Sequence, residues 1–123
     1  MGAKECAIVG GIVLVLFGLL GFFNNPVIGL FATNLMHNLY YIVGGIVLLA
    51  GAYSSLGSSM ALKIVGIVYA IVAILGFFLV NADGMLLGLF AMNTADQWLH
   101  VVVAILILAA GFLLPDEDKA MAM

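Results

Sequence analysis

Four long apolar stretches constrain the fold of this chain more than any other feature. They cover residues 6–23, 35–53, 61–80 and 97–114, and each is 18 to 20 residues long. About 20 helical residues cross the roughly 30 Å hydrocarbon core of a bilayer. The stretches are continuously apolar and lack the alternation of a membrane β-strand. The sequence therefore predicts an all-α polytopic integral membrane protein with four transmembrane helices, in a single membrane domain of residues 1–123.

The composition agrees with a lipid environment. Hydrophobic residues make up 67% of the 123 residues and charged residues only 7%, whereas a soluble domain is about half apolar and about a quarter charged. We therefore expect the lipid bilayer as the main partner. The net charge is −3, with three lysines and no arginine, so there is no basic surface for nucleic acid. The single Cys6 excludes an intramolecular disulfide and a cysteine metal site.

Four spans place both termini and the linker 54–60 on one side of the membrane, with segments 24–34 and 81–96 on the other. Lys4, Lys63 and Lys119 all lie on the side of the termini. Because lysine and arginine are retained in cytoplasmic segments, both termini are expected in the cytoplasm. The expected location is the cytoplasmic membrane or a specialised internal membrane.

An internal repeat organises the four spans. Segment 29–34, Gly-Leu-Phe-Ala-Thr-Asn, recurs fifty-nine residues later as segment 88–93, Gly-Leu-Phe-Ala-Met-Asn. Upstream, the matching segments are fifty-five residues apart, so the second loop contains four extra residues. Repeat one covers about 6–53 and repeat two about 61–114, followed by a short acidic tail, 115–123. Each repeat contains two spans, so the repeats are parallel and predict a pseudo-twofold four-helix bundle.

Small residues recur at helical spacing within each span and predict the packing faces. In lipid, helices associate through close backbone approach at small residues. The predicted packing positions are Gly11, Gly18, Gly44, Gly51, Gly66, Ala70, Ala104 and Gly111.

Segments 29–41 and 88–100 resemble the two signature segments of small bacterial membrane proteins known only as domain of unknown function 4383. In that family the first segment usually reads Asn-x-x-His-Asn-x-x-His and the second Asn-x-x-Asp-Asn-x-x-His. This chain has Tyr41 in place of the second histidine of the first segment, and Gln97 in place of the asparagine of the second. The resemblance covers nearly the whole chain and implies a four-helix membrane fold without an established activity.

A polar cluster follows from superposing the repeats, which pairs Asn34 with Asn93, His37 with Asp96, and Tyr41 with His100. Residues three or four apart share a helix face, so the two faces are expected to meet near one membrane surface. A structural interpretation is that the asparagines cap the helices, 94–97 forms a capping box, and His37 pairs with Asp96 across the axis.

A functional interpretation of the same cluster is also open. Ionisable groups within a membrane are candidate functional groups, and this set suits a small ligand, a metal ion, a tetrapyrrole, or a path for protons or small solutes. The spacing alone predicts no defined metal site and no cofactor. The sequence has no phosphate-binding loop and no nucleophile next to a suitable base, so we expect no enzymatic activity. The leading hypothesis is a structural or accessory subunit, present as a homo-oligomer or within a larger membrane protein assembly.

Overall fold

The computed structural model describes residues 2–82 and 84–115. Its elements are α1 (Ala3–Leu20), α2 (Leu35–Ala52), α3 (Ser58–Phe78), β1 (Met85–Leu86), β2 (Phe90–Ala91) and α4 (Thr94–Leu113). All four helices are long and apolar enough to cross a membrane, which confirms the predicted helical membrane protein. The predicted tail beyond residue 115, with Lys119, lies outside the described residues.

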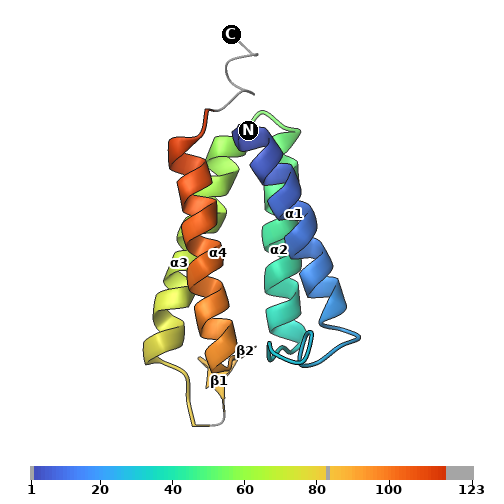
Figure 1. Cartoon of the computed structure of the whole chain (residues 1–123), viewed down its shortest axis with the longest axis vertical. Coiled ribbons are helices and arrows are strands. Elements are labelled where there is room, and N and C mark those ends of the chain that lie inside the picture. Colours follow the sequence, from blue (N-terminus) through green and yellow to red (C-terminus); the bar gives the residue numbers. More distant parts are fainter. Residues whose placement is uncertain (1, 83, 116–123) are drawn as a thin grey trace.

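The helices run alternately up and down between two ends of the bundle (Figure 1). We call the end with the start of α1, the α2–α3 loop and the end of α4 the terminal end. The other end, with segments 21–34 and 79–93, is the hairpin end. At the terminal end the backbone N–H of Ala3 donates to the Pro115 carbonyl (3.0 Å), which joins the two extremities of the described chain. Helices α1 and α3 therefore run in the same direction, as two copies in parallel orientation require.

Three helices begin earlier than the apolar stretches predict. Helix α1 starts at Ala3 because the Glu5 carboxylate accepts a hydrogen bond from the Gly2 amide (2.7 Å), and α4 starts at Thr94. Helix α3 starts at Ser58, so its first residues come from the predicted linker. There, the buried Ser59 hydroxyl donates to the Gly111 carbonyl (2.8 Å). A polar residue that bonds to a backbone carbonyl lies inside the bundle at little cost.

Two tight hairpins at the hairpin end were predicted only as loops. In the first, Val27 and Phe31 form an isolated bridge around Ile28 and Gly29. In the second, β1 and β2 pair antiparallel around Leu87 and Gly88. All four central residues have positive φ: 45° and 73° in the first hairpin, and 55° and 70° in the second. Two consecutive positive φ values are typical of a type I′ turn. The repeated Gly-Leu-Phe-Ala segment therefore begins inside a turn.

The predicted small residues lie where helices approach closely. A Cβ atom at Gly11 would be 2.8 Å from the Gly45 carbonyl oxygen, and one at Gly66 would be 2.8 Å from the Leu108 side chain. Gly44 contacts the Tyr69 hydroxyl. Added Cβ atoms would meet α2 at Gly18, and α3 at both Gly51 and Gly111. Ala104 is buried, and Ala70 is partly buried against the core. Gly45, whose Cβ would be 2.5 Å from the Gly11 carbonyl oxygen, was not predicted.

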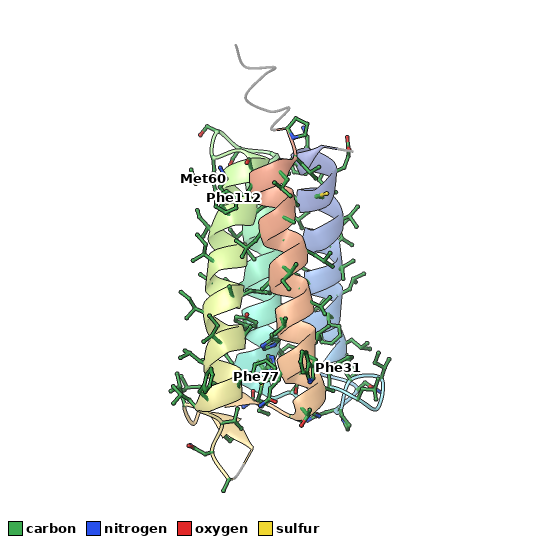
Figure 2. All side chains as sticks on the ribbon, turned by 60° about the vertical axis from the view of Figure 1, so that its left-hand side comes forward. Phe31, Met60, Phe77 and Phe112 are labelled. Carbon is green, nitrogen blue, oxygen red and sulfur yellow. The ribbon has the colours of Figure 1, made fainter. Side chains whose placement is uncertain are left out.

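The outward surface is apolar around the whole bundle. Large hydrophobic side chains project from all four helices, with Met60 and Phe112 at the terminal end and Phe77 at the hairpin end, where Phe31 lies in the first loop (Figure 2). Helices α1 and α4 contact each other sparsely, and a groove of about 370 Å³ separates them. It is lined by apolar side chains such as Val9, Val13 and Leu106. This surface matches a lipid environment.

Candidate functional site

The polar cluster lies inside the bundle near the hairpin end, on helices α2 and α4. His37 and Tyr41 belong to the first two turns of α2, and Asp96 and His100 to the first two turns of α4. All four side chains are buried, and the most exposed, Tyr41, has 2% of its surface accessible. The structure therefore brings together side chains that are 55 or more residues apart in sequence (from Tyr41 to Asp96).

The histidines are the centre of this cluster. His37 Nδ1 lies 2.7 Å from the Ala91 carbonyl oxygen, and His37 Nε2 lies 3.0 Å from His100 Nε2. The Tyr41 hydroxyl lies 2.9 Å from the same His100 nitrogen. The His37 and Tyr41 rings stack with centroids 4.9 Å apart, whereas the two imidazoles are nearly perpendicular. Two polar atoms of repeat one, His37 Nε2 and the Tyr41 hydroxyl oxygen, thus lie within hydrogen-bond distance of the same nitrogen of repeat two, His100 Nε2.

Asp96 acts as a capping residue. Its Oδ2 atom accepts a hydrogen bond from the Asn93 amide (3.0 Å), and its own amide donates to Asn93 Oδ1 (2.9 Å). This reciprocal pair is a capping box that starts at Asn93, one residue before the predicted one. The Ala32 backbone also interacts with this carboxyl group, but within the described chain Asp96 Oδ1 is buried without a hydrogen-bond partner of normal geometry.

The predicted pairing of His37 with Asp96 is wrong. Among the described residues no hydrogen bond joins these two side chains, because His37 bonds to Ala91 and His100 instead. Superposing the repeats identifies equivalent residues, and equivalent residues meet only where they lie next to the symmetry axis. Tyr41 and His100 fulfil this condition. His37 and Asp96, one turn nearer the hairpin end, do not.

The two asparagines hold the repeats together. Asn34 caps α2 by accepting from the His37 amide (3.0 Å), and its Nδ2 donates to the Leu89 carbonyl of the other repeat (2.9 Å). Asn93 caps α4 and donates in the same way to the Leu30 carbonyl (2.9 Å). The two donor asparagines are fifty-nine residues apart in the sequence, and so are the two acceptor leucines. Each loop thus receives a hydrogen bond from the helix cap of the other repeat.

Two further tyrosines were not predicted as part of this region. Tyr40 and Tyr69 stack with centroids 4.3 Å apart, and the Tyr69 hydroxyl donates to the Tyr40 carbonyl (3.2 Å). The Tyr40 hydroxyl is buried without a partner in the described chain, as is His100 Nδ1. A signal was available, since Tyr69 is a lone phenol in the middle of an apolar stretch and its hydroxyl requires a partner there.

Comparison with known families agrees with the resemblance of the two segments. The model of the family described as "Domain of unknown function (DUF4383)" matches residues 4–113. The chain belongs to this family. The residues matched to DUF4383 include both hairpins and nearly all of the four helices, and the family description gives no activity for the histidine cluster. Comparisons with curated proteins and with solved structures find no significant match.

Proposed function

We propose that this protein is a non-catalytic membrane subunit that acts through the packing of its helices. It serves as a structural or accessory component, either as a homo-oligomer or within a larger membrane assembly. The observation that carries the proposal is the contrast between inside and outside. The polar side chains His37, Asn38, Asp96 and His100 are buried, whereas large apolar side chains project from every helix. Lipid or apolar partner helices suit such an outer surface.

The oligomeric state tests this proposal directly. The full chain is extracted in a mild detergent and examined by native mass spectrometry, and cells that produce it at natural levels are treated with a membrane-permeant crosslinker. Defined oligomers, or one co-purifying membrane protein in fixed stoichiometry, would support the proposal. A strictly monomeric protein that crosslinks to nothing in the native membrane would refute it.

The cytoplasmic membrane is the proposed location, with a specialised internal membrane as the alternative and both termini in the cytoplasm. Lys4 and Lys63 support this orientation because both belong to the terminal end of the bundle, α1 and α3 starting there. Positive side chains are retained on the cytoplasmic side during insertion.

A second candidate function is binding or transport at the histidine cluster. The observation in its favour is a set of buried atoms that have no hydrogen-bond partner of normal geometry among the described residues, namely Asp96 Oδ1, His100 Nδ1 and the Tyr40 hydroxyl. Native proteins satisfy most buried polar atoms. A transport path has less support, because the other charged side chains of the described helices, Lys4, Glu5 and Lys63, lie toward the terminal end. Purified protein would be examined for a Soret band, bound metal and co-purifying lipid, and the absence of all three would reject this candidate.

A further inference from the structure

No neutral arrangement of protons gives every polar atom at the centre of the histidine cluster a partner among the described residues. The Ala91 carbonyl can only accept a hydrogen bond, so His37 Nδ1 (2.7 Å away) carries a proton. Neutral His37 therefore has its lone pair on Nε2. That lone pair faces His100 Nε2 at 3.0 Å, and the Tyr41 hydroxyl faces the same His100 atom at 2.9 Å. One nitrogen, with either one proton or one lone pair, has to serve two neighbours.

Each tautomer of His100 leaves one of these polar groups unsatisfied. If Nε2 carries the proton, it donates to His37, and the Tyr41 O–H then has no acceptor among the described residues. If Nε2 carries the lone pair, it accepts from Tyr41, and two lone pairs face each other at 3.0 Å. With a second proton, His37 Nε2 could donate to the lone pair of His100 Nε2. The Tyr41 O–H would then compete for that single lone pair. A cation that can accept lone pairs from several atoms at once removes this conflict.

We infer that His37 Nε2, His100 Nε2 and the Tyr41 oxygen together bind one transition-metal ion of the Cu²⁺ or Zn²⁺ class. A cation accepts one lone pair from each atom, so none of the three competes for another. Two ligand atoms that are about 2.1 Å from one ion and about 90° apart, the angle of a tetragonal Cu²⁺ site, lie about 3 Å from each other, whereas the tetrahedral angle usual for Zn²⁺ places them about 3.4 Å apart. The observed separations of 3.0 and 2.9 Å fit the tetragonal geometry.

The surroundings of the three atoms also fit a metal. A metal-binding histidine usually donates its other ring N–H to a carbonyl or carboxylate, which fixes the ring, and His37 does so to Ala91. Imidazole and phenolate ligands favour transition metals over Mg²⁺ and Ca²⁺. The described residues contain no group of three His, Cys, Asp or Glu side chains suited to a metal, so a site at this place depends on the Tyr41 oxygen as its third ligand.

Charge compensation explains the buried carboxylate. Negative charges nearby stabilise a divalent ion in an apolar bundle. Tyr41 supplies one as a phenolate after releasing its proton to the solvent. Asp96 supplies the other, because it lies one turn before His100 on the same face of α4 and its Oδ1 has no partner of normal geometry in the described chain. A tetrapyrrole fits less well, since the groove between α1 and α4 is lined by none of the four cluster residues.

Metal titration of the full-length protein tests the site. Protein with a histidine-free tag and Cys6→Ala is stripped with a chelator and titrated in detergent with Zn²⁺ or Cu²⁺. We expect one equivalent to bind, and Cu²⁺ to give a phenolate-to-copper charge-transfer band. Mg²⁺ at the same concentration should not bind. Because His37 and His100 are the two histidines of the chain, His37→Gln and His100→Gln should each weaken binding at least about tenfold.

The tyrosine variants keep the proposal falsifiable if the histidine variants do not fold. Tyr41→Phe should abolish the charge-transfer band, whereas Tyr69→Phe, which removes another buried hydroxyl, should preserve both the band and the stoichiometry. Folding of each variant is checked by its helical circular dichroism. Wild-type protein that is folded but binds far less than one equivalent would overturn the proposal, and so would a band that survives in Tyr41→Phe. The oligomeric state is measured separately, so this result does not depend on the proposed packing function.

Discussion

At the scale of single residues, Ile28 and Leu87 show strained backbone conformations at equivalent positions of the two repeats. Their φ angles are 45° and 55°, a region that costs a bulky L-residue about 1–2 kcal/mol. Type I′ turns favour Asn at this position, and the Ile28 side chain is exposed. We therefore expect Ile28→Asn to raise the free energy of unfolding by about 1 kcal/mol, measured by denaturant titration in detergent.

A matched control separates backbone strain from polarity. Leu30 lies two residues further along the same hairpin and is also exposed, but it is not among the residues with positive φ. Leu30→Asn should therefore give no stabilisation. If both variants stabilise the protein equally, polarity of the loop and not backbone strain is responsible.

The sequence predicts which residues belong to the polar cluster but not which atoms they contact. The residues of the cluster could be identified, because they are polar, repeated and embedded between apolar stretches. Their partners could not. Equivalence between repeats gives no information about distance from the axis, so the contact of His37 with His100 (3.0 Å) was missed. The contact with the Ala91 carbonyl was missed for a different reason, since every residue has a backbone carbonyl and a sequence pattern does not show which one accepts a hydrogen bond.

At the scale of helices, the closest approach of a glycine to the backbone of another helix joins α1 and α2. A Cβ atom at Gly45 would lie 2.5 Å from the Gly11 carbonyl oxygen and 2.9 Å from the Val15 amide nitrogen. These are backbone atoms, which cannot turn aside. We expect Gly45→Ala to destabilise the bundle by about 1–3 kcal/mol, measured as a lower free energy of unfolding. Gly10→Ala is the control, because its Cβ would meet only the Leu48 side chain at 3.4 Å, and alanine favours the helix.

The caps of α2 and α4 permit a second test at this scale. Asn34 performs two tasks, capping α2 with Oδ1 and bonding the Leu89 carbonyl with Nδ2. Asn34→Ser retains a capping oxygen and loses only the bond between repeats, so it should cost about 1 kcal/mol. Asn34→Ala loses both and should cost about 2 kcal/mol. Equal losses in thermal or denaturant unfolding would mean that the capping oxygen contributes nothing, whereas unchanged stability of Asn34→Ser would mean that the bond to Leu89 contributes nothing.

The helices were predictable because each apolar stretch is long enough to span a bilayer, while the hairpins were not. Strands β1 and β2 have two residues each, too few to show an alternating pattern. The turns of the two hairpins also use Ile-Gly and Leu-Gly in place of the Asn-Gly that normally indicates a type I′ hairpin. The early start of α3 was missed because Ser58 and Ser59 are polar, although both are buried.

At the scale of the whole molecule, the alternation of four helices fixes which segments share a side of the membrane. Ser55 is exposed in the loop at the terminal end, and Ala82 is exposed at the hairpin end. With Cys6→Ala as background, Ala82→Cys should react with a membrane-impermeant maleimide in intact cells. Ser55→Cys should react only after permeabilisation, because the proposed orientation, based on the lysines, places the terminal end in the cytoplasm. Ile71→Cys, on the lipid-facing surface of α3, should remain unlabelled, since a thiol in lipid does not form the reactive thiolate.

Labelling of both loop positions from the same side would contradict the four-span arrangement. Labelling with the two sides exchanged would contradict only the proposed orientation.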